Sequence, residues 1–320
     1  MPGGVEGGLI PPLSDLFNLG IAYSDFFKYH LRWFITAVAL QRYRGKGASE
    51  LITIKKYVRA ESLEQAYQLN QKRSNRILGG MLWMKMSSNT VQCAIDLSDV
   101  ISREIDERED SFVIGAMTPL RELETNKSLN QYTCGAIRES LRSIVGIQFR
   151  NTATVGGSVY GRFGFSDVLT MLLALDTSVQ LYRGGIVPLE TYANMPYDND
   201  IIVNIIIKKT PLKTAYMSSR NTRTDFPVLA CAISFYKDEQ RVVIGARPQK
   251  AMIIRADENV QKLIDSEAEV YAQALAGQVK REVLTSSNMR GSAEYRRHLA
   301  YVLTKRASLH ILDPKEAGIC

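Results

Sequence analysis

The sequence predicts an α+β protein made of three consecutive units. Between residues 51 and 105, short β-branched runs alternate with one amphipathic helical pattern. Between residues 106 and 210, helical patterns precede a hairpin and a strongly apolar strand. From residue 211 to 320, two strand-like runs come before three helical patterns. We therefore expect two α/β subdomains, which together span residues 51–210, followed by an antiparallel sheet packed by helices.

In the first unit, residues 51–58 alternate and are β-branched, which predicts a strand or an extended lead-in. Ser62 precedes apolar residues with helical spacing and is a candidate N-cap. The short segment RIL at residues 76–78 runs into a Gly-Gly pair, and residues 93–100 and 112–118 resemble further strands. The pattern is typical of an α/β unit with short connections.

The second unit should contain two amphipathic helices, at 120–129 and 134–145. Asp167 is a candidate cap for a following helix that is apolar on all sides and therefore predicted to be buried. Gly184-Gly185 is expected to supply a positive φ at a hairpin turn. Residues 200–209 predict a strong buried strand.

The third unit carries two strand-like runs, at 229–236 and 241–246, on either side of a KDEQ turn. After Pro248 the chain is expected to turn helical. The three helical patterns occupy residues 257–265, 267–283 and 292–312.

Composition excludes several classes of protein. The net charge is +7, but basic residues are scattered among acidic ones, so we predict no nucleic-acid module. The four cysteines lie far apart and the three histidines are unclustered, which argues against a metal site built by this chain alone. Sparse thiols without a secretory cleavage signal fit the cytoplasm.

Residues 1–50 differ from the rest of the chain. They open Gly-rich, and their longest mostly apolar stretch, Trp33–Leu40, is far shorter than the roughly 20 residues that a membrane span requires. An interfacial helix stays open as an alternative. We expect an N-terminal extension outside the core fold, with the functional chain beginning at about Leu51.

Two glycine pairs are the best candidates for a ligand site. Glycines allow backbone N–H groups to approach a phosphate closely, and consecutive N–H groups in a turn form an anion-binding nest. Either pair alone is more often a structural turn, and neither fits the Gly-x-Gly-x-x-Gly fingerprint. Together they could hold a pyrophosphate from both sides. The candidate residues are Ile77, Leu78, Gly79, Gly80, Met81, Leu82 and Trp83 in the first segment, and Thr152, Thr154, Gly156, Gly157 and Ser158 in the second.

The segments ILGGMLWMKM, FVIGAMTPLREL, VGIQFRNTATVGGSVYGRFGFSDVLTMLLALD and NMRGSAEYRRHLAYVLTKRA occur in this order along the chain. From Leu51 to about Ala307 the chain resembles the FAD-binding subunit of the molybdenum hydroxylases, the group of xanthine dehydrogenase and carbon monoxide dehydrogenase. The third segment is the most specific match, because it is similar to the family's Arg-Asn-x-x-Thr-Ile-Gly-Gly-Asn loop and its downstream Asp.

The resemblance implies a PCMH-type fold in which two α/β subdomains hold FAD. Both glycine segments would bind the pyrophosphate, and Asp167 would hold the nucleotide end. Ile144 would lie near the flavin, and the strand backbone at Ile202 would touch its ring. The chain departs from the family at Met81, Leu82, Ser158 and Met217, of which the last replaces a Lys that some relatives carry near the flavin. Trp83 and Met84 are more often core residues than cofactor contacts.

The implied function is electron transfer without catalysis on substrate by this chain, with no metal of its own. FAD would pass electrons from an iron–sulfur subunit to NAD or another acceptor. A molybdopterin-binding subunit would hold the substrate, with purines the expected class. Two alternatives remain: a flavin-free structural or maturation protein that keeps the fold, and a self-sufficient flavin oxidase of the vanillyl-alcohol type.

Overall fold

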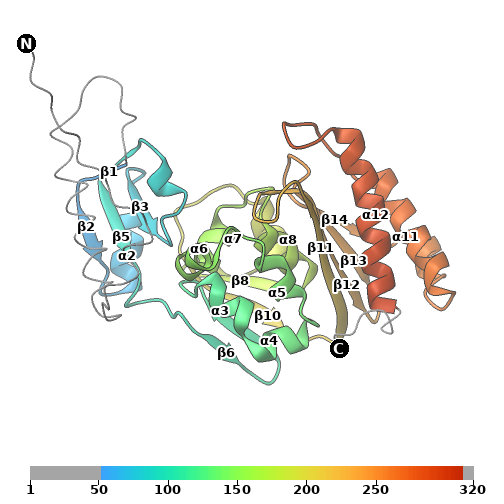
Figure 1. Ribbon diagram of the computed structural model, residues 1–320. Helices are drawn as coiled ribbons and strands as arrows, with labels where there is room; N and C mark the ends of the chain where they lie inside the picture. The colour runs from blue at the N-terminus through green and yellow to red at the C-terminus, as the bar shows by residue number, and fades with distance from the viewer. Residues whose placement is uncertain (1–51, 313–320) are drawn as a thin grey trace, which may run out of the picture. The chain divides into compact units, whose positions relative to one another are not determined.

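The computed structural model describes residues 52–312 and contains three main sheets in that range (Figure 1). The predicted extension at residues 1–50 lies outside the described residues. Within residues 52–312, no helix is both long and apolar enough to cross a bilayer.

The first sheet has three parallel strands in the order β2-β5-β3. Ser62 caps its helix as predicted, because its side chain accepts a hydrogen bond from the N–H of Gln65. The expected strand at 51–58 is split, because the chain leaves β4 at Lys55 and joins β5 from Lys56 onward. The elements are β1 (Thr53–Ile54), β2 (Tyr57–Arg59), α2 (Leu63–Asn70), β3 (Asn75–Leu78), η3 (Met84–Met86), β4 (Thr90–Val91) and β5 (Cys93–Asp96).

The second sheet has five antiparallel strands in the order β6-β7-β10-β8-β9. The predicted hairpin is confirmed, and Gly185 has a φ of 68° at its turn. The strands are β6 (Ile105–Glu107), β7 (Ser111–Gly115), β8 (Thr177–Leu181), β9 (Gly185–Pro188) and β10 (Ile202–Lys208).

Seven helices accompany this sheet within the described range. The helix expected at 120–129 is broken because the Asn126 side chain accepts from the N–H of Leu129 and starts a new helix. α8 is buried along its whole length, as predicted, but Ser166 caps it and Asp167 is its first residue. The helices are α3 (Leu120–Thr125), α4 (Lys127–Tyr132), α5 (Ala136–Leu141), α6 (Ile147–Thr152), α7 (Val155–Tyr160), α8 (Asp167–Ala174) and α9 (Leu189–Asn194).

The third sheet has four antiparallel strands in sequential order, two more than the sequence predicts. Buried and exposed residues do not alternate along β11, and β14 is only four residues long, so neither strand has a clear sequence pattern. The three helices that follow are confirmed. The elements are β11 (Leu212–Arg220), β12 (Pro227–Tyr236), β13 (Gln240–Gly245), β14 (Met252–Arg255), α10 (Glu258–Gln261), α11 (Ala268–Glu282) and α12 (Ala293–Leu312).

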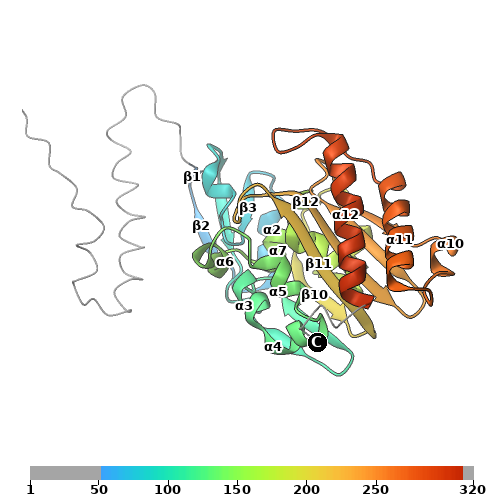
Figure 2. The same ribbon diagram turned by 45° about the vertical axis from the view of Figure 1, so that its right-hand side comes forward.

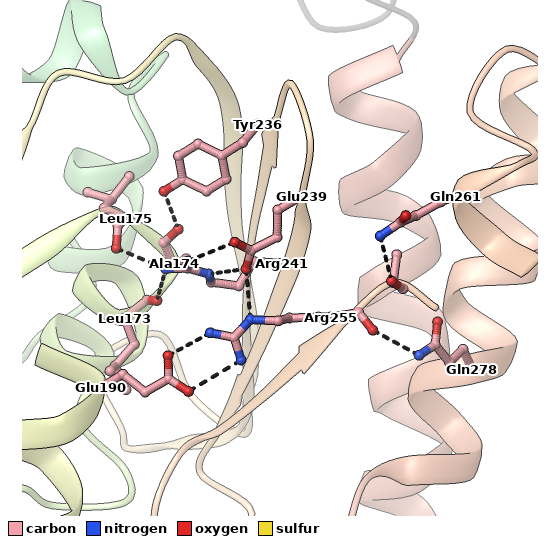
Figure 3. A network of polar contacts seen from close by, with 11 residues as sticks. Leu173, Ala174, Leu175, Glu190, Tyr236, Glu239, Arg241, Arg255, Gln261 and Gln278 are labelled. Atoms are coloured by element: carbon pink, nitrogen blue, oxygen red, sulfur yellow. Dashed lines mark hydrogen bonds and ion pairs between the residues drawn. The ribbon is translucent and has the colours of Figure 1, made fainter. Parts of the chain in front are cut away.

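This third sheet is packed on both faces. Figures 1 and 2 show α11 and α12 along one face, and α8 contacts β12 and β13. Polar contacts bind the α8 side as well (Figure 3): the Tyr236 hydroxyl donates to the Ala174 carbonyl at 2.9 Å, and Arg255 pairs with Glu190 on α9 at 2.6 Å. The sheet is thereby fixed to the helices that follow the second glycine segment.

Candidate functional site

The two glycine segments lie against each other. A Cβ built at Gly80 would be 2.1 Å from the Thr152 carbonyl oxygen, and one built at Gly79 would be 2.9 Å from Thr154 Oγ1. No side chain fits at these separations. The structure therefore brings the predicted segments together, and the first pair of glycines makes their close approach sterically feasible.

The first segment presents unused backbone donors. Ile77 and Leu78 end β3, and the chain then bends at Gly79-Gly80. The N–H groups of residues 80–83 have no acceptor among the described residues. Met81 has a φ of 58°, a left-handed conformation that is uncommon outside glycine. Successive N–H groups around a residue of this kind form an anion-binding concavity, so the geometry fits a phosphate.

The side chains of this segment do not bind polar groups. Met81 packs against a small core that includes Leu78 and Ala94, and Met84 packs there too, as predicted for Met84. Leu82 packs against the larger core. The apolar side chains at positions 81 and 82 therefore fix the loop by packing and leave only the backbone to bind a ligand.

The second segment is built differently from the expectation. Gly156 and Gly157 lie in the first turn of α7, not in a turn of positive φ. The N–H of Gly156 donates to the Ala116 carbonyl at 2.9 Å, and the N–H of Gly157 donates to Thr154 Oγ1 at 3.2 Å. The expectation of free N–H groups at this glycine pair is therefore wrong. Thr154 caps the helix by accepting from Gly157, and the carbonyl of Ala116, directly after β7, accepts from Gly156.

Two of the three hydroxyl groups of this segment also donate to backbone carbonyls. Thr152 donates to the Gln148 carbonyl at 3.1 Å, and Ser158 donates to the Thr154 carbonyl at 2.9 Å. Thr154 Oγ1 accepts from Gly157, so the hydroxyl proton of Thr154 is the one in this segment without an acceptor among the described residues. It faces the first segment, because the Gly79 position lies beside Thr154 Oγ1.

Asp167 is buried, with 5% of its surface exposed, and its Oδ1 accepts from Arg220 Nη2 at 2.6 Å and from the Tyr216 hydroxyl. Burial raises the pKa of the Asp167 carboxyl, and the Arg220 guanidinium opposes this rise. Arg220 also donates to the Asp225 carbonyl at 2.6 Å. Asp167 therefore links α8 to β11 and to the loop that follows β11.

Ile202, Ile144 and Met217, which the sequence placed near the flavin, differ in how they contact the two glycine segments. Ile202 begins β10, and its neighbour Val203 accepts from the N–H of Ala116, the residue that holds Gly156. The Ile144 carbonyl accepts from Arg150 at 2.8 Å, and Ile144 makes no hydrogen bond to either segment. Met217 packs against the core beneath α11 and α12.

An aromatic cluster adjoins the first segment, and no sequence pattern predicted it. Trp83 stacks on Phe226 with ring centroids 5.8 Å apart, and Phe163 and Phe165 lie 5.7 Å from Trp83. Trp83 is 45% exposed, so the alternative that it packs in the core does not hold. Phe163 and Phe165, on either side of Gly164, were the available clue in the sequence, whereas nothing local marks Phe226.

Comparisons with known proteins agree with this arrangement. A family model described as the FAD binding domain in molybdopterin dehydrogenase matches residues 51–210, and the CO dehydrogenase flavoprotein C-terminal domain matches residues 214–311. The uncharacterized protein YgfM of Escherichia coli (strain K12) is 27% identical over 270 residues, which are 83% of this chain and 98% of that protein.

Two more distant relatives extend the comparison. The glyceraldehyde dehydrogenase medium chain of Sulfolobus acidocaldarius is 23% identical and covers 78% of this chain and 96% of its own length. A chain of carbon monoxide dehydrogenase from Hydrogenophaga pseudoflava has the same fold, with a TM-score of 0.70 and 21% identity over 80% of this chain and 96% of its own. The predicted fold and resemblance are confirmed: this chain belongs to the FAD-binding flavoprotein subunits of the molybdenum hydroxylase family, and its cofactor is FAD.

Proposed function

We propose that this chain is the electron-transfer subunit of a xanthine dehydrogenase-like complex. In this proposal it works between the iron–sulfur clusters of one partner and NAD or another acceptor, while a molybdopterin-binding partner holds the substrate. Family membership over residues 51–210 and 214–311 supports the flavin subunit role. The Sulfolobus acidocaldarius relative is named as the medium chain of its enzyme, which supports a multi-subunit setting.

The observation that carries the cofactor site is the row of unused N–H groups at residues 80–83, directly beside the second segment. We assign the FAD pyrophosphate to these donors and to the Thr154 hydroxyl. Hydrogen bonds to a charged group contribute about 1.5–3 kcal/mol each. Losing two of them would weaken binding by on the order of 10² to 10⁴.

We assign one of the two ring systems of FAD to the neighbourhood of the aromatic cluster. Trp83 and Phe226 offer apolar ring faces next to the free donors, and flat rings pack well on such faces. When bound, FAD supplies both one-electron and two-electron redox chemistry. The residues of this chain bind and orient it.

The experiment compares the tagged chain expressed alone with the chain isolated together with its partners. Both preparations should show a flavin absorbance spectrum. The isolated chain should oxidise reduced nicotinamide slowly and should not hydroxylate xanthine, whereas the complex should reduce its flavin with xanthine. Hydroxylation by the chain alone would refute the subunit role. A flavin in the complex that no purine reduces would refute the purine assignment while leaving electron transfer intact.

A further inference from the structure

A cavity of about 470 Å³ lies beside the loop that carries Phe163 and Phe165, because Arg162 of that loop lines it. α8 and α9 form its walls together with the segment between β13 and β14. Leu169 and Leu173 line its apolar side, while Arg162, Arg247 and Lys250 supply three cationic groups. None of the residues assigned to FAD, at 77–83, 144, 152–158, 167 or 202, lines it.

No carboxylate among the described residues pairs with the three cationic groups of this cavity. Glu190 also lines it, but its carboxylate is held by Arg255, with Nη2 at 2.6 Å and Nη1 at 3.3 Å (Figure 3). Asp198 makes no ion pair with Arg162 and instead accepts from the N–H of Asp200 at 3.2 Å. No ion pair within residues 52–312 involves any of the three cationic residues.

The partners of two of these cations are neutral. Arg247 donates to the carbonyl oxygens of Lys250 at 2.7 Å and Leu284 at 2.6 Å, and to the side-chain amide oxygen of Gln249. Lys250 Nζ donates to the Ala193 carbonyl at 3.0 Å. Burial lowers the pKa of the Arg247 guanidinium, and no carboxylate offsets this effect. These hydrogen bonds orient two positive charges without neutralising them.

Arg162 gives the most direct sign of a missing ligand. Only 6% of its surface is exposed, and Nη1 donates to the Met195 carbonyl at 2.6 Å. Its Nε and Nη2 are buried and have no acceptor. The guanidinium lies over the rings of Tyr192 at 4.1 Å and Tyr197 at 4.7 Å, which support its charge. Nε and Nη2 together form the fork that binds two oxygens of one anion.

We propose that this cavity is a binding site for a small oxyanion, a carboxylate or phosphoryl group, whose two oxygens bind Arg162 while Arg247 and Lys250 complete the charge balance. The site is separate from that of FAD. Its ligand is of the size of a small metabolite, because the cavity holds a few hundred Å³ and is apolar along α8.

The test is calorimetric titration of the FAD-loaded full chain, at constant ionic strength set with chloride. One titrant is inorganic phosphate and the other is succinate, so that phosphoryl and carboxylate ligands are distinguished. We expect at least one of them to bind once per chain. Arg162→Gln should weaken that binding by about tenfold or more, because it removes a charge-assisted pair of hydrogen bonds. Lys250→Met should weaken it as well and serves if the first variant does not fold.

The matched control is Arg142→Gln, which removes an exposed arginine paired with Glu139 and should leave binding unchanged. Flavin content is measured on every variant, and Arg162→Gln should keep its FAD. The proposal is overturned if neither titrant binds, or if both variants bind as the wild type does. Loss of FAD from a folded Arg162→Gln protein would also overturn it, since the cavity would then belong to the flavin site.

Discussion

The two glycine pairs of this chain look alike in sequence but use their backbones in opposite ways. After Gly79-Gly80, four consecutive N–H groups lack an acceptor among the described residues, and Met81 adopts a positive φ. At Gly156-Gly157, the N–H groups already donate to Ala116 and to Thr154. The first pair offers donors, whereas the second is part of a capped helix.

The difference shows that a Gly-Gly pair does not by itself identify a phosphate loop. Glycine can leave room for a ligand at the backbone, or it can let two backbones meet. Gly156 does the latter, since a Cβ there would lie 2.7 Å from both Cβ and O of Ala116. The second segment therefore acts chiefly as the rigid wall against which the first segment is held.

The largest expected effect on stability comes from the buried ion pair that holds the second glycine segment in place. Glu124 on α3 accepts from Arg150 Nε at 2.6 Å and Nη2 at 3.1 Å, and both side chains are buried. Glu124→Gln would leave the Arg150 charge buried and uncompensated, which costs about 3–5 kcal/mol. Chemical denaturation would measure the loss. The control is Glu139→Gln at the exposed pair with Arg142, which should cost about 0–1 kcal/mol; equal losses in the two variants would contradict the prediction.

The same pair predicts a pH dependence. Burial alone would raise the pKa of Glu124, but hydrogen bonds from Arg150 and Arg121 bring it below its ordinary value of 4.5. A carboxyl with a lowered folded-state pKa stabilises the fold above its unfolded pKa and loses this contribution as the pH falls through the folded value. The stability gap between wild type and Glu124→Gln should therefore be constant near neutral pH and shrink below about pH 4.5. A gap that widens in acid would show that the sign is wrong.

The next effect tests the contact between the segments. Gly80→Ala places a Cβ 2.1 Å from the Thr152 carbonyl oxygen, so the first loop must move away from the second. Overpacking of this kind costs about 1–3 kcal/mol. FAD affinity should fall by on the order of 10² or more as N–H groups leave their positions. Flavin content after gel filtration and fluorescence titration with FAD would measure it.

The control for this substitution is Gly277→Ala in α11, where the added Cβ meets only Arg281 Nη1 at 3.6 Å. Since Ala is favoured over Gly inside a helix, this variant should be stabilised by about 0.5–1 kcal/mol and should keep its FAD. Full FAD occupancy in a folded Gly80→Ala protein would disprove the assignment of the first loop.

A smaller effect should separate the two members of the second pair. Gly156→Ala meets the Ala116 backbone at 2.7 Å and should cost about 1–3 kcal/mol of stability. Gly157→Ala meets only Thr154 Oγ1 at 3.0 Å, at a more exposed position, and should cost clearly less. Thermal and denaturant unfolding of the two variants side by side would check this. If Gly157 proved the more sensitive, the second pair would have a ligand role and the contrast between the loops would fail.

Local patterns allowed much of the fold to be predicted, because they depend on near neighbours. α8 is apolar on all sides and is buried, β12 and β13 are strong strand runs, and Gly185 has the positive φ that its hairpin needs. Asn126 shows the limit of a periodicity argument: its side chain ends one helix and caps the next within a pattern that reads as continuous.

The site was harder to predict because its geometry depends on residues far apart in the chain. Asp167 pairs with Arg220, 53 residues away, and no local pattern reveals that pair. Its role at the nucleotide end of FAD stays a prediction. The aromatic cluster joins Trp83 to Phe226 across 143 residues for the same reason. The two glycine segments lie together as predicted, while the hydrogen bonds that distinguish the two pairs required the fold.

The smallest effect isolates the one contribution that the second segment makes through a side chain. Thr154→Val keeps the shape of the side chain but removes the cap on Gly157 and the hydroxyl proton that faces the first segment. Loss of the cap should cost about 0.5–2 kcal/mol of stability. Loss of one hydrogen bond to phosphate, at about 1.5–3 kcal/mol, should weaken FAD by roughly tenfold to a hundredfold. Thr152→Val is the matched control, because the Thr152 hydroxyl already donates to Gln148 and the residue is exposed. Fluorescence titration should show weaker FAD binding for Thr154→Val alone; equal affinities would mean that the backbone of the first loop holds the pyrophosphate without this hydroxyl.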